Sequence, residues 1–417
     1  MSTQIKNIIQ IADFFCKQNN ERARFCSLVN NLSIMTKEEY ASRLNECSGL
    51  NVIFQLTDKC VLSCKYCFAK GSHGDVPTFQ IDMLEEAIKQ AFDTRHTYVT
   101  FEWTGGEPLL VGLDFYKNVV ELQKKYATKP YENGVQTSGN VFNTGLIDFL
   151  LENGFDISTT IDGTEKIHNQ NRPANGNKPS FQNVQKTREY IEQKGCSCGF
   201  ISTITRNNLG YEKEMLDFFQ EQGVYSFHSN PYIYYSKNKV KDSEIALSNE
   251  DYARYFIAEF NAWIEKGKVE PIPRTINDII KCLETRCPSH NTICTFGGRC
   301  VSNFIALAPN GDAYNCPKFT GSRNMILGNI TEQPIKEILS HSSAAMSRLI
   351  DQRVAAINAC EKKGCKYFYI CNGGCPYYSF IASNGENVSE IDCLCEGKTL
   401  LYKYLESVVD LINSSSK

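Results

Sequence analysis

A regular alternation of short apolar strands and amphipathic helices constrains the fold of this chain more than any other feature. Residues 51 to 228 predict six strand–helix units, one roughly every 30 residues. The predicted strands cover residues 52–56, 98–103, 134–138, 155–161, 199–205 and 224–228. Alternation at this spacing is typical of a parallel sheet with helices packed outside it. The predicted fold class is therefore α/β, and a partial (β/α)6 barrel of the TIM type fits the pattern.

Four chemically distinctive loops follow predicted strands. They cover residues 60–67, 104–108, 137–138 and 162–163. The carboxyl ends of parallel barrel strands lie on one face, and barrel enzymes place their functional residues there. The sequence therefore predicts one shared site built from these loops.

The composition indicates a packed protein without a nucleic-acid or membrane partner. Hydrophobic residues make up 42% of the 417 residues and charged residues 22%, and the formal net charge is -3. No basic run suggests a nucleic-acid footprint, and no apolar stretch approaches the length of a membrane span. The polar start of the chain is not followed by a long apolar run with a cleavage site, so we expect no signal peptide. A cytoplasmic location is the expectation that follows.

Cysteine usage is extreme, at 19 of 417 residues. In a secreted chain this would suggest disulfides, but without a signal peptide metal binding is the better interpretation. Zinc and iron–sulfur clusters both use thiolate ligands. The count alone leaves a zinc loop, a cluster and buried free cysteines all open, and spacing has to separate them.

The tightest group of cysteines is Cys60, Cys64 and Cys67. Three thiolates in so short a loop can each bind one iron of a four-iron cluster, which leaves the fourth iron open for chemistry. The Cys-x3-Cys-x2-Cys spacing, with Tyr66 before the last cysteine, resembles the signature of the radical SAM enzymes. In that family the open iron binds S-adenosylmethionine (SAM), which is cleaved to a carbon radical.

Further motifs at strand ends strengthen this resemblance. The segment 104–108 reads Thr-Gly-Gly-Glu-Pro, similar to a family motif that holds the amino group of the methionine moiety, and glycines allow such a close backbone approach. An Asp-Gly pair followed by His168, Asn169 and Arg172 resembles another family element, although capped turns with solvated side chains explain these residues equally well. The cofactor-binding residues that the resemblance implies are Tyr66, Thr104, Gly105, Gly106, Glu107, Thr160 and Asp162.

The C-terminal cysteines, with Gly311 five residues before Cys316, resemble the SPASM domain, which holds two auxiliary four-iron clusters. The resemblance implies Cys294, Cys300, Cys316 and Cys375 for the first cluster, and Cys360, Cys365, Cys371 and Cys393 for the second. Four residues separate Cys360 from Cys365 where the family usually has two. Cys395 is a spare candidate for Cys393, and Cys287 for Cys294. The cysteines outside these ligand sets are expected to be mostly small buried hydrophobes: Cys16, Cys26, Cys47, Cys196, Cys198, Cys282, Cys287 and Cys395.

Three domains follow from these patterns. Residues 1–50 are expected to form a helical segment without a strand, residues 51–280 the radical SAM partial barrel, and residues 281–417 the SPASM domain. Within the last domain we predict a hairpin over 304–314 with an Asn-Gly turn, a cysteine-dense loop over 360–395 and a closing helix over 400–411.

The layout resembles both the anaerobic sulfatase-maturating enzymes and the SPASM enzymes that modify ribosomally made peptides. The sulfatase maturases carry an Asp directly after the third cysteine of the first auxiliary cluster, as a base on the substrate Ser or Cys. Pro317 occupies that place here and cannot take a proton, and Lys318 beside it would have to be neutral to do so. The identity of the catalytic residue stays unknown.

The sequence thus predicts a radical SAM maturase that abstracts a hydrogen from a ribosomally made precursor peptide and installs an intramolecular carbon–carbon or thioether cross-link. It would use SAM, three 4Fe-4S clusters and a reductant such as flavodoxin or ferredoxin. Formylglycine formation on a sulfatase is the alternative reaction, and a non-catalytic iron–sulfur electron carrier is the alternative of another class.

Overall fold

The computed structural model describes residues 35–69, 77–233, 244–267, 270–286, 294–297 and 300–415, and the structural statements below concern these residues. The expected helices before residue 35, and Cys16, Cys26 and Cys287, lie outside them. Within the described part, helix α2 (Lys37–Asn45) confirms the helical expectation, and it begins with a capping box on Thr36. Strand β1 already starts at Gly49, so the expectation that no strand lies within residues 1–50 is wrong by two residues.

The strands form one sheet in the order β10-β9-β8-β1-β2-β3-β4-β5-β6-β7. Its strands are β1 (Gly49–Gln55), β2 (Tyr98–Thr104), β3 (Tyr131–Gln136), β4 (Phe155–Thr160), β5 (Gly199–Ile204), β6 (Ser226–Pro231), β7 (Ile272–Pro273), β8 (Phe304–Leu307), β9 (Asp312–Tyr314) and β10 (Ile326–Asn329). Strands β1 to β7 pair in parallel, each with the next along the chain. This confirms the partial barrel and all six predicted strands, with small shifts at their ends.

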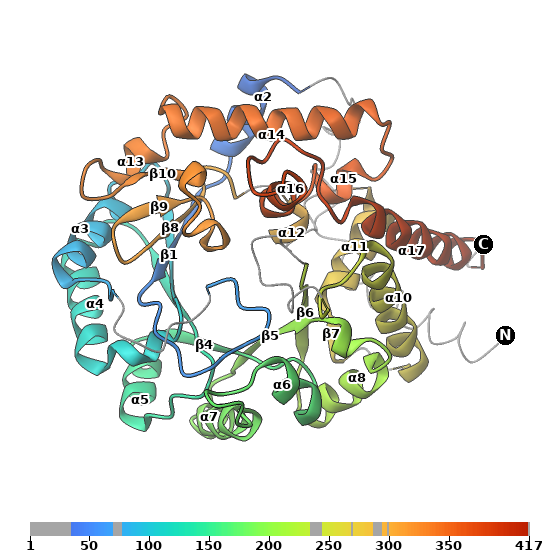
Figure 1. The fold of residues 1–417 in the computed structure, drawn as a ribbon, viewed down its shortest axis with the longest axis horizontal. Helices are drawn as coiled ribbons and strands as arrows, with labels where there is room; N and C mark the ends of the chain where they lie inside the picture. The colour runs from blue at the N-terminus through green and yellow to red at the C-terminus, as the bar shows by residue number, and fades with distance from the viewer. Residues whose placement is uncertain are drawn as a thin grey trace.

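Helices surround the sheet on the outside (Figure 1). They are α3 (Ile81–Phe92), α4 (Leu113–Tyr126), α5 (Thr144–Glu152), α6 (Glu165–Asn171), α7 (Phe181–Gln193), α8 (Glu212–Glu221), α10 (Asn249–Lys266) and α11 (Arg274–Thr285). The strand-to-helix loops therefore gather at one face, as parallel βα units require.

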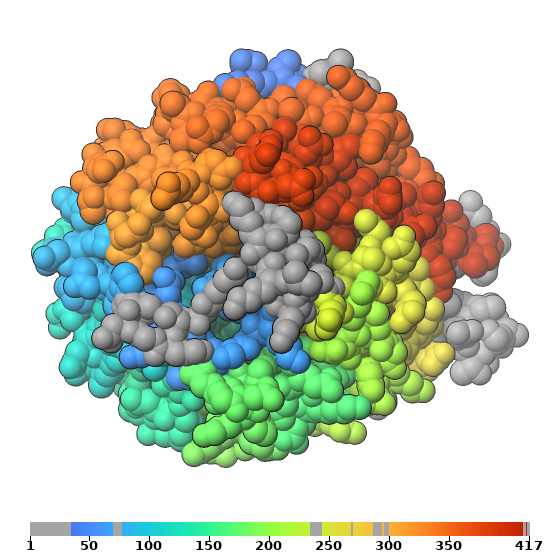
Figure 2. All heavy atoms as spheres, in the orientation of Figure 1, coloured from blue at the N-terminus to red at the C-terminus, as the bar shows by residue number. Residues whose placement is uncertain are grey.

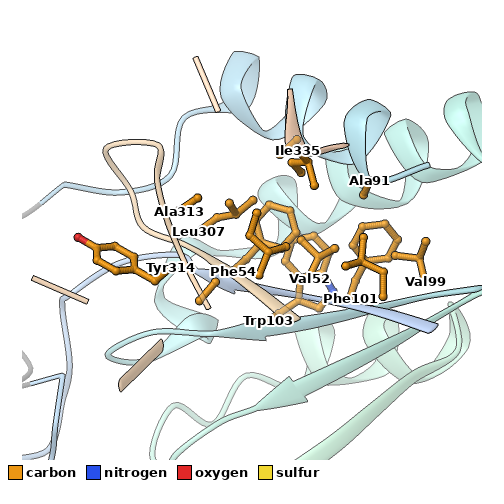
Figure 3. Packing of buried hydrophobic residues seen from close by; sticks show 14 of the residues in the cluster. Val52, Phe54, Ala91, Val99, Phe101, Trp103, Leu307, Ala313, Tyr314 and Ile335 are labelled. Carbon is orange, nitrogen blue, oxygen red and sulfur yellow. The ribbon is translucent and has the colours of Figure 1, made fainter. Parts of the chain in front are cut away.

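Alternating burial along the first two strands builds the hydrophobic core (Figure 3). Phe54 of β1 and Phe101 and Trp103 of β2 are fully buried under α3. The rings of Phe54 and Trp103 stack with centroids 4.6 Å apart. This packing fixes the two strands whose carboxyl ends carry the cysteine triplet and the Gly-Gly turn.

The C-terminal region continues the barrel sheet. Strand β8 pairs in parallel with β1, in the register Asn51↔Phe304, and then antiparallel with β9. The turn between β8 and β9 contains Asn310 and Gly311, so the predicted hairpin is confirmed. Figure 2 shows the orange and red C-terminal residues lying directly against blue and yellow residues of the barrel. The cysteine-rich region thus packs against the barrel along a continuous sheet.

The expectation of a cysteine-dense loop over 360–395 is wrong in part. Helix α14 (Ala344–Lys362) ends just beyond Cys360, and α15 (Phe368–Cys371) and α16 (Pro376–Ala382) follow. The closely spaced cysteines hide the helical periodicity, because each helix places its cysteine at or next to an end. The closing helix is confirmed but longer than predicted, as α17 (Cys395–Ser415).

Candidate functional site

A cavity of about 280 Å³ lies at the carboxyl ends of the barrel strands. Its walls include residues from the ends of β2 to β6, such as Thr104, Gln136, Thr160 and Asn230. A cavity of this size with several polar groups is the usual form of a small-molecule site. Three of the four predicted strand-end loops contribute residues to this cavity, whereas the loop at residues 162–163 does not line it.

Cys60, Cys64 and Cys67, hereafter the cysteine triplet, all line this cavity. Burial raises the pKa of the Cys60 thiol to about 11 and that of Cys64 to about 12, and the charge of Cys67 contributes to both shifts. Thiols that raise each other's pKa lie close together, and they become thiolates once a metal supplies positive charge. The arrangement fits the ligand set of a cluster.

Backbone hydrogen bonds hold the triplet loop against the barrel. The Ser63 amide donates to the Pro173 carbonyl at 2.8 Å, and the Lys65 amide donates to the Asn171 carbonyl at 2.9 Å. Asn171 is the last residue of α6, and Pro173 lies two residues beyond it. The loop is therefore positioned by a helix that the sequence analysis did not identify, since its seven residues are too few for a clear periodicity.

The two glycines of the Thr-Gly-Gly-Glu turn allow this loop to pack closely. Gly105 has φ +136°, and a Cβ there would lie 2.6 Å from the Thr57 carbonyl oxygen. A Cβ on Gly106 would lie 2.7 Å from the Lys59 carbonyl carbon, and its amide donates to Thr57 at 2.6 Å. The glycines line the cavity as predicted. They are also required because the chain leading into the triplet loop lies directly on them.

Glu107 lies behind the cavity wall. Its carboxylate is fully buried and accepts hydrogen bonds from the Thr137 hydroxyl at 2.7 Å, the Ser138 amide at 2.9 Å and the Ser138 hydroxyl. Thr137 and Ser138 line the cavity, whereas Glu107 does not. Glu107 therefore fixes two hydroxyl groups that face the cavity, and its predicted contact with the cofactor stays a prediction.

Asp162 also lies behind the wall, beneath Tyr66. The Tyr66 hydroxyl donates to Asp162 Oδ1 at 3.1 Å and accepts from Arg172 Nη1 at 2.7 Å. Burial raises the pKa of Asp162 to about 6, against the opposing charge of Arg172. Tyr66 and Arg172 line the cavity and Asp162 does not, so Asp162 positions Tyr66. Thr160 lines the cavity as predicted and accepts a hydrogen bond from Gln136 at 3.3 Å.

His168 has a structural environment. Its side chain is fully buried, its Nε2 lies 3.1 Å from the Ser180 hydroxyl, and its ring meets Phe181 edge-on. Burial lowers its pKa well below the ordinary value. Asn169 accepts from the backbone amides of Ser180 and Phe181, so both residues join α6 to the start of α7.

The structure brings the four cysteines predicted for the first auxiliary cluster together. Burial and the charges of Cys375 and Cys294 raise the pKa of the Cys300 thiol to about 12. Burial, together with the charges of Cys375 and Cys300, also raises the pKa of Cys316. These four residues are hereafter the first auxiliary set.

The second group differs from the prediction at one position. Cys360, Cys365, Cys371 and Cys395 line a small cavity of about 20 Å³ and are hereafter the second auxiliary set. Cys393, the predicted fourth ligand, is not part of that lining. Its thiol pKa is instead raised by burial, by Asp392 and by Cys375.

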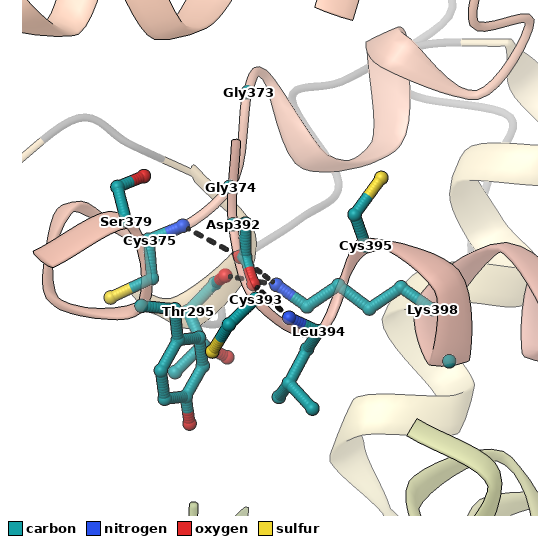
Figure 4. A network of polar contacts seen from close by, with 12 residues as sticks. Thr295, Gly373, Gly374, Cys375, Ser379, Asp392, Cys393, Leu394, Cys395 and Lys398 are labelled. Carbon is teal, nitrogen blue, oxygen red and sulfur yellow. Dashed lines mark hydrogen bonds and ion pairs between the residues drawn. The ribbon is translucent and has the colours of Figure 1, made fainter. Parts of the chain in front are cut away.

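A local turn explains why Cys395 replaces Cys393 in this cavity. Asp392 Oδ1 accepts from the Leu394 amide at 2.8 Å, and helix α17 starts at Cys395. In Figure 4 the sulfurs of Cys375 and Cys393 lie on one side of the Asp392–Lys398 pair and that of Cys395 on the other. Both cysteines were candidates for this position in the sequence, and the turn at the start of α17 places only Cys395 in the cavity.

Within the residues that the structure describes, no three His, Cys, Asp or Glu side chains are grouped closely enough to hold one metal ion. Two thiolates on one zinc ion lie only about 3.8 Å apart, given Zn–S bonds of about 2.3 Å. A four-iron cluster binds each thiolate at a different corner and therefore tolerates wider spacing. The family model that matches residues 294–366 describes an iron–sulfur cluster-binding domain, which favours clusters over zinc.

Family models agree with this site. The model of the radical SAM superfamily matches residues 54–219, and the model of the SPASM iron–sulfur cluster-binding domain matches residues 294–366. The two models, together with the barrel fold, show a radical SAM enzyme. The chain belongs to those members of the superfamily that carry a SPASM domain after the barrel, and both domains imply iron–sulfur clusters and SAM. The alternative of a non-catalytic electron carrier is therefore not supported.

Similar proteins cover most of the chain. A cysteine-type anaerobic sulfatase-maturating enzyme of Clostridium perfringens is 25% identical over 359 residues, which is 83% of this chain and 93% of that protein. A serine-type enzyme of Bacteroides thetaiotaomicron is 24% identical over 379 residues, covering 86% and 89%.

Solved structures show the same fold. Native anSMEcpe with bound AdoMet and Cp18Cys peptide has a TM-score of 0.75 at 23% identity, covering 88% of this chain and 99% of that one. Streptococcus suis SuiB bound to precursor peptide SuiA has a TM-score of 0.58 at 16% identity, covering 86% and 79%. Among the described residues, none of the helices has the length and apolar character needed to span a membrane.

Proposed function

We propose that this enzyme is an oxidative maturase of a ribosomally made peptide and installs an intramolecular cross-link. Two C–H groups of the peptide would be replaced by one new bond. One hydrogen leaves as an atom, and the other leaves as a proton and an electron. When bound, SAM and its cluster supply the radical that takes the hydrogen atom, and the auxiliary clusters supply an acceptor for the electron.

The observation that carries the proposal is the absence of carboxylates in the cavity wall. No Asp or Glu side chain is among the described residues that line it. Pro317 stands where the sulfatase maturases have their Asp, and its carbonyl lies 3.5 Å from Gln55 Nε2. Oxidation of a Ser or Cys side chain requires removal of a proton from a hydroxyl or thiol, for which a positioned base is useful. A cation formed on an aromatic ring by carbon–carbon bonding loses its proton readily to water, so this reaction needs no such base.

The proposal assigns the cofactors to named residues. The cysteine triplet would hold the SAM-binding cluster, with Thr104, Gly105, Gly106 and Thr160 facing SAM and Tyr66 beside it. The first and second auxiliary sets would hold one cluster each, for a total of three. In the second set we assign Cys395 as the fourth ligand in place of Cys393, because Cys395 shares the cavity with its partners.

The experiment uses the anaerobically reconstituted protein with SAM, dithionite and synthetic peptides encoded by the small reading frames beside its gene. We expect one peptide to lose two hydrogens per link, with fragmentation locating the joined residues. A Cys64→Ala protein is the control for radical-independent changes. Unchanged masses for all these peptides, in reactions where SAM is cleaved, would contradict the proposal.

Formylglycine formation is the second candidate, because the similar proteins that cover most of the chain are named anaerobic sulfatase-maturating enzymes. A peptide with a sulfatase activation motif tests it in the same assay. A Cys-containing peptide would lose two hydrogens and then exchange hydrogen sulfide for water, whereas its Ser counterpart would lose two hydrogens only. Either change, located at the motif residue, would favour this activity over cross-linking.

The remaining partners are proposed from the chemistry. The cluster of the triplet requires one electron per SAM cleaved, which a flavodoxin or ferredoxin can supply. Such oxygen-labile centres suit a reducing cytoplasm. Both assignments can be checked by replacing dithionite with a flavodoxin and its reductase in the assay above.

A further inference from the structure

Lys318 brings a positive charge to the wall of the SAM cavity. It lies in a short 3-10 helix (Pro317–Phe319) directly after Cys316 of the first auxiliary set, and its side chain is half-buried. Its ammonium lies 5.2 Å from the ring centroid of Tyr377 and 5.7 Å from that of Tyr378. All three side chains line the same cavity as the cysteine triplet.

The tyrosines give the lysine a fixed platform. Tyr378 is buried, and its hydroxyl donates to the Pro231 carbonyl at the end of β6 at 3.3 Å. Both tyrosines lie in α16, directly after Cys375. A cation over two aromatic faces is attracted to them and stays oriented, while its N–H groups remain available to an anion.

Among the described residues that line the cavity there is no carboxylate, and an anionic group with which Lys318 interacts is the thiol of Cys316 in the first auxiliary set. Apart from the thiols, its charged lining residues within the described chain are Lys318 and Arg172. Arg172 is buried and donates to Tyr66. Lys318 takes part in none of the ion pairs found among the described residues. A half-buried lysine facing a ligand cavity without a carboxylate partner is suited to bind an anion of the ligand.

We infer that Lys318 determines substrate specificity by binding a carboxylate of the peptide, from an Asp or Glu side chain near the reacting residue or from the peptide's C-terminus. This rests on the proposed function, because it assumes a peptide in the cavity. It reassigns the position next to the missing base: the family's Asp would remove a proton from the substrate, whereas Lys318 selects a substrate that carries its own carboxylate.

Competition binding tests this inference without requiring turnover. The protein is reconstituted with iron and sulfide and saturated with SAM. It then captures peptides from three equal pools, read by mass spectrometry. One pool contains Asp or Glu and has amidated ends, the second has Asn or Gln at those positions, and the third has neutral side chains with a free C-terminal carboxylate.

We expect the wild-type protein to enrich a carboxylate-bearing pool over the Asn/Gln pool by roughly tenfold or more, as for hydrogen bonds to charged groups. Whichever carboxylate pool is enriched identifies the source. K318Q should abolish the enrichment, K318R should keep most of it, and K318E should shift the preference to Lys-containing peptides. K117Q is the matched control, since Lys117 forms an exposed ion pair with Asp114 far along the chain.

Three results would overturn the inference: no enrichment by the wild-type protein, equal enrichment by wild type and K318Q, or loss of SAM binding by K318Q at wild-type iron content. The last result would place Lys318 on the carboxylate of SAM. Enrichment that depends on Lys318, combined with no cross-linked product from any peptide, would uphold the inference and contradict the proposed function alone.

Discussion

The cysteine triplet and the second auxiliary set differ most in the space beside their thiols. The triplet faces a cavity of about 280 Å³ at the strand ends, whereas the second set lines about 20 Å³. Three thiols with open space suit a centre that binds a small molecule. Four thiols around a small space suit a closed centre that exchanges only electrons. On the proposed assignment, the same residue type would serve two purposes, and the difference would lie in how tightly the chain encloses the thiols.

The polar support behind the two regions differs as well. Beside the triplet, the Tyr66 hydroxyl donates a hydrogen bond to Asp162 and accepts one from Arg172. These three side chains are hereafter the relay. Behind the second set, Asp392 and Lys398 pair directly at 2.6 Å with side chains only 4% and 3% exposed. A relay tolerates loss of one hydrogen bond better than a buried ion pair tolerates loss of one charge.

The largest effect on activity is expected for substitutions in the cysteine triplet, hereafter the open centre; the second auxiliary set is hereafter the closed centre. Cys64→Ala should abolish SAM cleavage, because two thiols cannot hold the cluster that binds SAM. The measurement is 5′-deoxyadenosine formed per enzyme under dithionite, with iron content alongside it. Cys47→Ala, at a cysteine outside all three groups, is the control and should keep wild-type values. SAM cleavage by C64A would contradict the assignment of the SAM-binding cluster to the triplet.

The closed centre gives the next largest effect. Cys395→Ala should lose the iron of about one four-iron cluster and one signal in the electron paramagnetic resonance spectrum. Cys393→Ala should keep its full iron content, because Cys393 lies with Cys375 and outside the second set. The opposite pattern would restore the ligand assignment implied by family resemblance.

The ion pair behind the closed centre predicts a large loss of stability. Lys398→Met leaves Asp392 buried without its partner and should lower the free energy of unfolding by about 3–5 kcal/mol. Lys336→Met, at an exposed pair with Asp93, should cost less than about 1 kcal/mol. Urea unfolding under anaerobic conditions compares the two. Equal effects would show that burial does not set the importance of these pairs.

The Gly-Gly turn predicts an intermediate effect on the open centre. In Gly106→Ala the new Cβ would lie 2.8 Å from the Asp58 carbonyl oxygen, so the triplet loop must shift. We expect SAM cleavage to fall by roughly tenfold or more, as for small misplacements of reacting groups. Gly145→Ala, whose nearest atom would be a side-chain oxygen at 3.7 Å, is the matched control. Full activity of G106A would remove the packing role assigned to this glycine.

The relay behind the triplet predicts the smallest effect, and one that depends on pH. Because the pKa of Asp162 is raised to about 6, its protonated form favours folding, and stability falls as pH rises from about 4 to about 6. Tyr66→Phe removes a donor to the ionised carboxylate. It should therefore cost about 1–2 kcal/mol at pH 8 and less at pH 5.5. A pH-independent cost in urea unfolding would contradict this account of the relay.

The sequence predicted the parts of the molecule that depend on local pattern. Strand alternation placed β1 to β6, and cysteine spacing with the Gly-Gly turn placed the open centre. The position of Glu107 could not be predicted, because its hydrogen bonds to Thr137 and Ser138 cross from β2 to β3. The choice between Cys393 and Cys395 depends on a turn at the start of α17, which spacing alone does not encode.

The position of Lys318 relative to the cavity also could not be predicted from the sequence. The missing Asp at Pro317 could be read from the sequence, but the tyrosines under Lys318 come from α16, some 60 residues further along the chain. Only the fold shows that this lysine faces the cavity of the triplet.

The most direct test of the central claim, that the open centre is catalytic and acts on a peptide, is one anaerobic reaction analysed for two products. The reconstituted enzyme, SAM, dithionite and the peptides encoded beside its gene are combined, and 5′-deoxyadenosine and peptide mass are measured together. We predict 5′-deoxyadenosine in proportion to a peptide that has lost two hydrogens, and neither product with C64A. SAM cleavage that leaves every peptide unchanged, or no SAM cleavage by a fully iron-loaded enzyme, would contradict the account.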